Sequence, residues 1–221
     1  MKNWKIGTRI AAGFAAIIIS SMALSVFAFR SVSYINQGTI RITQHATQGV
    51  FLVGQLQSNV LRNFNLLLQH VSAHDKAEKD AVENEIKGLR ASNDSVLQQY
   101  ESLLSGDKEK ALYQALKAAR GNSRVQFNEV MRLSQESKNK EAIALLDREL
   151  KALQRKYQEA ASNLVAYNKS AADSDGRAIE ATVGGARTGI IFGLLAGSGA
   201  AILIALFVVR GIVLPLRRPS A

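Results

Sequence analysis

IAAGFAAIIISSMALSVFAF, residues 10–29, is flanked by an arginine on each side and contains no charged side chain. A second uncharged stretch, TGIIFGLLAGSGAAILIALFVV, occupies residues 188–209, again between two arginines. At about 1.5 Å of rise per residue, a helix of either length crosses the roughly 30 Å hydrocarbon core of a bilayer. We therefore predict two transmembrane helices. The first is too long for the apolar core of a signal peptide, which favours an uncleaved anchor.

Charge is distributed unevenly around these two stretches. The formal net charge is +10, yet all 18 acidic residues lie within residues 30–187, and the short flanks 1–9 and 210–221 carry only basic ones. Unopposed positive charge beside a membrane span marks the cytoplasmic side. We expect both termini inside and residues 30–187 outside, which argues against a nucleic-acid partner for that middle segment.

The middle segment has the composition of a helical domain. The only prolines are Pro215 and Pro219, so nothing before them forbids a continuous helix, and no strand-like alternation bounded by turn residues is present. The chain has no cysteine, which excludes disulfides and thiolate metal sites. We expect a domain that folds by helix packing alone.

Four amphipathic helices can be traced by apolar residues spaced three and four apart. The first continues from residues 10–29 through a weak region, Asn36 to Gly49, and shows its stripe from Val53 onward. A turn near residues 74–78 offers Asp75 as N-cap and an acidic residue three positions later, the pattern of a capping box. The second helix begins there.

The remaining helices follow after short connections. The second helix carries the stripe Val82, Ile86, Leu89, Asn93, Val96, Tyr100 and Leu103. A third is expected from about Lys108 to Glu136, and a fourth from near Glu141 directly into the second apolar stretch. Tyr157 and Tyr167 fall on the fourth stripe as core residues, with a pocket-lining hydroxyl as the alternative reading.

These elements predict an all-α, antiparallel up-down-up-down four-helix bundle, with two transmembrane helices continuous with the first and last bundle helices. The expected order is a cytoplasmic leader (1–9), transmembrane helix 1 (10–29), a four-helix-bundle sensor domain (30–187), transmembrane helix 2 (188–209) and a basic C-terminal segment (210–221).

Three segments resemble bacterial methyl-accepting chemotaxis receptors with a four-helix-bundle ligand-binding domain. MKNWKIGTR (1–9) is similar to their basic leader, ESKNKEAIALL (136–146) to the turn into their fourth helix, and RGIVLPL (210–216) to their entry into HAMP. The resemblance covers the whole chain, which would be a receptor's sensing half.

Such a resemblance implies a transmembrane chemoreceptor of the bacterial inner membrane, with a periplasmic sensor domain that works as a homodimer. It implies a small, anionic solute, an organic acid or amino acid, and a helix displacement that controls chemotaxis signalling. The cytoplasmic kinase complex would be reached only through a segment beyond Ala221. No cofactor, metal or enzymatic activity is implied, and no catalytic motif is found in the sequence.

Candidate ligand-binding residues come from a polar row beside the apolar stripe of the first bundle helix. Ser58, Arg62, Asn65 and Gln69 recur at spacings of three and four, and a guanidinium among hydrogen-bonding groups suits a small anion. Solvent exposure would produce the same row. The family's aspartate sensors place several arginines on this helix, whereas this chain has one, so we consider Arg120 and Arg124 on the third helix as additional ligands.

Two further patterns are singled out. His70 and His74, four residues apart on a helix, have metal-ligand spacing but lack further ligands. Gly185, Gly189, Gly193, Gly197, Ala201 and Ala205 recur every four residues, a small-residue face expected to pack against the first span or against a dimer mate.

Two alternative functions remain at the level of the sequence. The same scaffold serves the sensor half of a histidine kinase or nucleotide cyclase, because the output is decided beyond residue 221. From another class, the chain would be a ligand-free, membrane-anchored helical rod.

Overall fold

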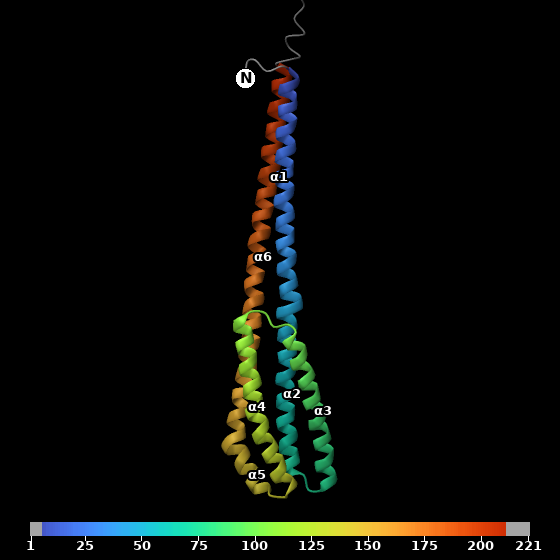
Figure 1. Cartoon of the computed structure of the whole chain (residues 1–221), viewed down its shortest axis with the longest axis vertical. Coiled ribbons are helices and arrows are strands. Elements are labelled where there is room, and N and C mark those ends of the chain that lie inside the picture. Colours follow the sequence, from blue (N-terminus) through green and yellow to red (C-terminus); the bar gives the residue numbers. More distant parts are fainter. Residues whose placement is uncertain (1–5, 211–221) are drawn as a thin grey trace, which may run out of the picture. The chain divides into compact units, whose positions relative to one another are not determined.

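The computed structural model describes residues 6–210, and within that range every regular element is a helix (Figure 1). The chain divides into two compact units, one formed by both ends of the chain, Met1–Ile40 with Asp175–Ala221, and one by Arg41–Ser174. The all-α four-helix bundle expected from the stripes is confirmed, as are long first and last helices able to span a membrane. Residues 1–5 of the predicted leader and 211–221 of the predicted HAMP start, with Pro215, lie outside the described residues.

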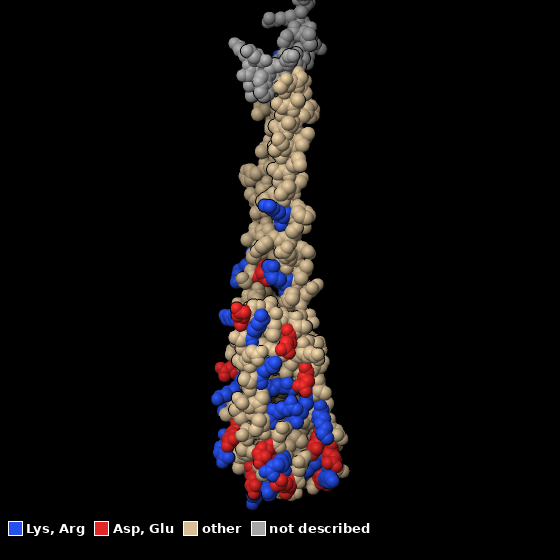
Figure 2. Space-filling model, in the orientation of Figure 1, with Lys and Arg blue, Asp and Glu red and all other residues tan. Residues whose placement is uncertain are grey.

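The unit formed by the chain ends contains α1 (Ile6–Ile40) and the C-terminal part of α6 (Lys151–Val208). Figure 2 shows that its described part lacks charged side chains over much of its length. Apolar side chains such as Phe14 and Phe192 are well exposed there, as is expected of helices that face lipid. That these helices cross a membrane, with spans at 10–29 and 188–209, stays a prediction.

Glycines bring the two helices of this unit together. A Cβ added at Gly189 would lie 2.7 Å from Phe27 Cε1, and one at Gly193 would lie 2.9 Å from Leu24 Cδ1, both closer than real Cβ atoms approach. The small-residue face therefore packs on α1 at these two positions, as the four-residue period predicts. Gly197, in the same register, meets nothing within 4 Å.

The bundle contains α2 (Thr47–Ser72), α3 (Lys76–Glu101), α4 (Asp107–Gln135) and a fourth column made of α5 (Asn139–Leu145), η2 (Leu146–Leu150) and the first part of α6. Successive columns run in opposite directions (Figure 1). A π-helical turn, η1 (Arg41–Ala46), lies inside the predicted weak region and joins α1 to α2. The first helix therefore changes from α-helical to π-helical hydrogen bonding at this point and continues without ending.

The turns are specified locally. Asp75 caps α3 by accepting from the backbone N–H of Glu78 at 2.8 Å, and the Glu78 carboxylate accepts from the N–H of His74 at 3.2 Å. The predicted capping box is confirmed, except that Glu78 reaches the residue before the N-cap. Before α4, Gly106 has a φ of 76°, a conformation that favours glycine.

Two apolar clusters form the core. The first cluster is built from Leu52, Val53, Leu56, Val60, Val96, Leu97, Tyr100, Tyr113, Leu116, Tyr157, Ala161 and Leu164. The second cluster is built from Leu66, Leu67, Val71, Val82, Ile86, Phe127, Val130, Leu133, Ala142, Leu146 and Leu150. Most residues of the predicted stripes are buried, which confirms the helical periodicity; Leu89, Leu103 and Tyr167 are only partly buried.

Candidate ligand-binding site

A polar layer separates the two apolar clusters. In each bundle column, residues of the first cluster are separated from those of the second by a segment that supplies polar side chains to the interior. The layer consists of Asn63 of α2, Arg90 and Asn93 of α3, Arg120, Ser123 and Arg124 of α4, and Gln154 of α6. Three of the seven, Asn93, Ser123 and Gln154, are buried. Asn63, Arg90 and Arg120 are half-buried, and Arg124 is exposed. Buried polar groups lower stability unless they are hydrogen-bonded, so a polar layer at one level of the core calls for an explanation beyond folding.

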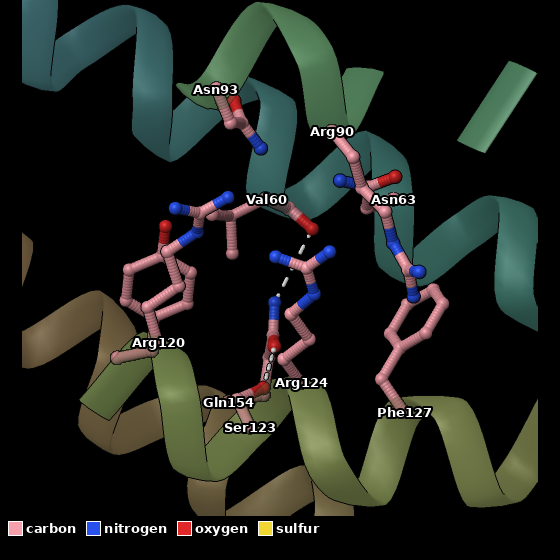
Figure 3. Close-up of a pocket in the computed structure, with 10 residues that line it drawn as sticks. Val60, Asn63, Arg90, Asn93, Arg120, Ser123, Arg124, Phe127 and Gln154 are labelled. Carbon is pink, nitrogen blue, oxygen red and sulfur yellow. Dashed lines mark hydrogen bonds between the residues drawn. The ribbon is translucent and has the colours of Figure 1, made fainter. Parts of the chain in front are cut away.

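The polar layer lines a cavity of about 50 Å³ that is partly open to solvent, here called the arginine cavity. Its walls come from all four columns and also include Val60, Phe127 and Tyr157. Figure 3 shows the guanidinium groups of Arg90, reaching from α3, and of Arg120 and Arg124, reaching from α4, around the same space. A groove of about 270 Å³ between α3 and α4 adjoins it and shares Arg120 and Arg124.

The three arginines are incompletely neutralised. Arg120 pairs with Asp94 at 2.5 Å, and Arg90 donates to Asn128 Oδ1 at 2.7 Å while its guanidinium carbon lies 5.0 Å from the centre of the Phe127 ring. Among the residues that the structure describes, Arg124 has no ion-pair partner, and no carboxylate lines the cavity. Burial, and then the neighbouring Arg124 and Arg120, lower the pKa of Arg90, which marks a site of excess positive charge.

Part of the layer is held by internal hydrogen bonds. Gln154 Nε2 donates to the carbonyl of Val60 at 3.3 Å, and Ser123 Oγ donates to Gln154 Oε1 at 3.1 Å (Figure 3). Asn93 Oδ1 accepts from Asn59 Nδ2 at 2.9 Å. These bonds fix α2, α3, α4 and α6 against one another at the level of the cavity.

Two other polar atoms of the cavity wall have no partner. Within the described chain, three buried side-chain polar atoms lack a hydrogen bond, and two of them, Asn63 Oδ1 and the Tyr157 hydroxyl, belong to residues lining this cavity. Tyr157 is only 5% exposed, and burial raises the pKa of its hydroxyl to about 12, so it stays a neutral donor. Such orphans are rare and costly in native proteins. The arginine cavity therefore has the unmet hydrogen-bonding capacity of a binding site.

The residues predicted from the sequence fall into two places. Arg120 and Arg124 line the cavity, together with Arg90, which the sequence reasoning missed. Arg62 does not line it: the side chain is 63% exposed and pairs with Glu85 at 3.1 Å. Ser58, Asn65 and Gln69 are likewise exposed on α2. The structure does not bring the α2 row together with the α4 arginines.

A signal for the cavity was nevertheless present in the stripes. Asn93 stands at a core position of the second helix, and it proves to be buried. Ser123 and Gln154, buried at the same level of their helices, interrupt the other stripes. A polar residue at core spacing in several helices at one height predicts a polar layer; Arg90 and Asn63, half-buried beside it, are harder to find.

His70 belongs to a separate buried cluster. Ser134 Oγ donates to the carbonyl of His70 at 3.0 Å, so His70 Nδ1, also 3.0 Å from that hydroxyl, must be the donor to it. His70 Nε2 lies 3.2 Å from Glu83 Oε1. His74 is joined through its backbone to Glu78, and no group of three or more potential metal ligands occurs among the described residues. The two histidines thus have different surroundings.

Comparison with known families matches residues 3–183 to a four-helix-bundle sensory module for signal transduction. The chain belongs to that family. The module is typical of methyl-accepting chemotaxis proteins, which confirms the resemblance noted in the sequence, and it is typically non-catalytic. Searches of curated proteins and of solved structures gave no match. The family places the arginine cavity inside a domain whose general role is sensing.

Proposed function

We propose that this sensory module is the sensing half of a transmembrane chemoreceptor of the bacterial inner membrane, and that a small anionic solute bound in the arginine cavity controls chemotaxis signalling. The observation that carries the proposal is the cavity itself: three guanidinium groups and two unpartnered polar atoms inside the bundle of a sensory domain. An organic acid or an amino acid would supply the missing negative charge and hydrogen bonds. No cofactor or metal is needed for this role.

The charge pattern supports a periplasmic sensor domain. The charged residues of the segments 1–9 and 210–221, beside the two apolar stretches, are all basic, as expected of cytoplasmic flanks. Within the described part of the chain, two helices are long and apolar enough to cross a membrane. Contact with the chemotaxis kinase complex would be made by a segment following HAMP, in the cytoplasm.

The fourth column offers a route for the signal. Gln154 and Tyr157 line the cavity, and both lie on α6, which continues without a break to Val208 in the second apolar stretch. A ligand that binds two packings of the bundle unequally would shift the balance between them. Displacements of about 1–2 Å are the scale at which packed helices exchange arrangements.

An exposed seam on α2 supports a homodimer. Phe51, Gly54, Ser58, Leu61, Asn65, Leu68 and Ser72 are all exposed, and their alternating spacing of three and four is that of a coiled-coil seam. The α2 helix of a second copy would cover the exposed Phe51, Leu61 and Leu68 in a symmetric contact. Because the chain has no cysteine, Leu61→Cys should form a disulfide-linked dimer in membranes, whereas Lys87→Cys on α3 should not.

Calorimetric titration of the full chain in detergent micelles tests the sensing role. Small organic acids and amino acids are compared with their uncharged amides. A ligand that binds only the folded state should stabilise the chain by about 2.7 kcal/mol at roughly 100 times its dissociation constant. Should none of the anions bind or stabilise it, the chain would be the ligand-free rod and the proposal would be wrong.

A chimaera tests the output. The chain is joined through its C-terminal residues to the HAMP and signalling region of a chemotaxis receptor and expressed in cells without other receptors. The anion that binds in vitro should change swimming behaviour, and Arg124→Gln, at the arginine without an ion-pair partner, should abolish the response. A response retained by Arg124→Gln would contradict the assignment of this cavity.

A further inference from the structure

The two orphan atoms of the arginine cavity restrict the ligand beyond its negative charge. The Tyr157 hydroxyl can donate to a carboxylate oxygen, and it has no other acceptor in the described residues. Asn63 presents a buried amide oxygen, which needs a donor. Were the amide turned over, its nitrogen would need an acceptor instead. A hydroxyl group both donates and accepts, so it satisfies Asn63 in either orientation.

The positive charge of the arginine cavity disfavours an ammonium group, the other common hydrogen-bond donor of small solutes. An ammonium group would also donate to Asn63, but it would enter a cavity lined by Arg90, Arg120 and Arg124 and by no carboxylate. Like charges in a partly buried site repel strongly, and burial together with the neighbouring arginines already lowers the pKa of Arg90. The cavity therefore favours a neutral donor over a cationic one.

The space limits the size of the ligand. A water molecule needs roughly 10–15 Å³ of cavity measured in the same way, so 50 Å³ accommodates about four. That corresponds to a ligand of a few non-hydrogen atoms. The adjoining groove, lined by Arg120 and Arg124 but also by Asp94 and Glu101, leaves room for a second polar group. Val60 and Phe127 supply apolar wall for a short carbon chain.

Resting on the proposed sensing function, we propose that the arginine cavity binds a small hydroxy acid of two to four carbons within a single protomer. Its carboxylate lies between Arg124 and Arg120 and accepts from the Tyr157 hydroxyl, and its hydroxyl group pairs with Asn63. Such a site selects a hydroxy acid over the amino acid of the same skeleton. It also lies apart from the exposed α2 face that carries Arg62.

Binding of matched triplets to the full chain in detergent micelles tests the proposal. The three-carbon set is lactate, propionate and alanine, and the four-carbon set is malate, succinate and aspartate. In each set the hydroxy acid should bind at least tenfold more tightly than the acid without the hydroxyl, and the amino acid should bind most weakly. Equal or tighter binding of alanine or aspartate would overturn the proposal.

Variants locate the site. Tyr157→Phe should weaken lactate binding about tenfold, and Arg124→Gln should weaken it more. Asn63→Leu should remove the preference for lactate over propionate, and thermal unfolding of each variant confirms that it folds. Arg62→Gln, the matched change at an exposed arginine, should leave the affinity unchanged. Loss of binding in Arg62→Gln but not in Arg124→Gln would move the site to α2 and overturn the proposal.

The results of these binding experiments distinguish a failure of the hydroxy-acid assignment from a failure of the proposed sensing function. If anions bind but the hydroxyl group gives no advantage, the hydroxy-acid assignment is wrong and the sensing role stands. If no member of either triplet and no other small anion binds, the proposed function itself has failed. The two results cannot be confused, because the first shows binding heat and the second shows none.

Discussion

Two of the polar sites inside the bundle, the arginine cavity and a network around Tyr100, differ in whether their hydrogen bonds are complete. In the network the Tyr100 hydroxyl donates to Glu109 Oε1 at 2.7 Å and accepts from Asn168 Nδ2 at 2.6 Å. Glu109 Oε2 accepts from the N–H of Ser105 at 2.9 Å and from its hydroxyl. In the arginine cavity, two polar atoms have no partner at all.

Their neighbours have adapted to them in different ways. Gly49 leaves room for Asn168: a Cβ there would lie 2.8 Å from Asn168 Oδ1, so the chain has given up a side chain to fit the network. Nothing comparable closes the arginine cavity, which keeps about 50 Å³ of space. A buried network whose hydrogen bonds are complete holds α6 and the loop before α4 in place. A network with unpaired polar atoms can instead form hydrogen bonds to a ligand. This difference distinguishes buried polar groups that stabilise the fold from those that are left to bind a ligand.

The largest effect is expected from Glu109→Ala, which tests whether the Tyr100 network stabilises the fold. The substitution removes the acceptor of the buried Tyr100 hydroxyl and of the Ser105 N–H. Hydrogen bonds to a charged group contribute more than neutral ones, so we expect the free energy of unfolding to fall by about 3 kcal/mol. Urea unfolding of the full chain in detergent, followed by circular dichroism, measures it. Glu159→Ala, at an exposed position of α6, is the control and should cost less than about 0.5 kcal/mol.

Removing one hydroxyl from each site should have opposite effects. Tyr100→Phe leaves Glu109 and Asn168 without a partner, and we expect a loss of about 1.5 kcal/mol. Tyr157→Phe removes an unpartnered buried hydroxyl and should leave the free energy of unfolding unchanged or raise it by about 1 kcal/mol. The same unfolding measurement compares the two variants without ligand. A similar loss in both would show that the Tyr157 hydroxyl has an internal partner.

The buried His70 cluster makes a third prediction, through pH. The hydrogen bond from Gln135 and, less strongly, His70 hold the pKa of Glu83 below its ordinary value of 4.5, against the opposing effect of burial. Because the folded-state pKa is lowered, ionised Glu83 stabilises the bundle above the unfolded-state pKa, and this contribution is lost as the pH falls through the folded-state pKa.

Glu83→Gln should therefore be about 1 kcal/mol less stable than the native chain at about pH 7, with the difference vanishing toward about pH 3. Thermal unfolding across this range provides the measurement, and Glu85→Gln, an exposed neighbour on α3, is the control. A difference independent of pH would show that the charge of Glu83 does not contribute.

The sequence was sufficient for the helices because their apolar period is regular and their stops are local. Asp75 and Gly106 mark turns by side-chain chemistry and backbone conformation, both of which a short window contains. The apolar stretches depend only on composition and length. These features need no knowledge of which helices are neighbours.

The site depended on facts that no single helix contains. Arg90 becomes a cavity residue only because α3 and α4 pack so that it lies over Phe127 near Arg124. Arg62, one residue before Asn63, instead lies outside and pairs with Glu85. On a helix, adjacent residues are about 100° apart, and the rotation of α2 decides which of the two faces the interior. This rotation places the predicted polar row on the exposed face of α2 and places Asn63, one residue after Arg62, in the cavity wall.

The smallest effect is expected from Arg62→Ala, which tests an exposed arginine on α2 against the arginines of the cavity. The ion pair with Glu85 joins two side chains that are 63% and 54% exposed, so it gains little energy in water and is screened by salt. We expect the free energy of unfolding to change by no more than about 0.5 kcal/mol, and less still in high salt, in the urea experiment. A loss above about 1 kcal/mol would mean that Arg62 is buried in the assembled protein. The homodimer contact proposed on α2 would then extend beyond Phe51, Leu61 and Leu68 to include Arg62.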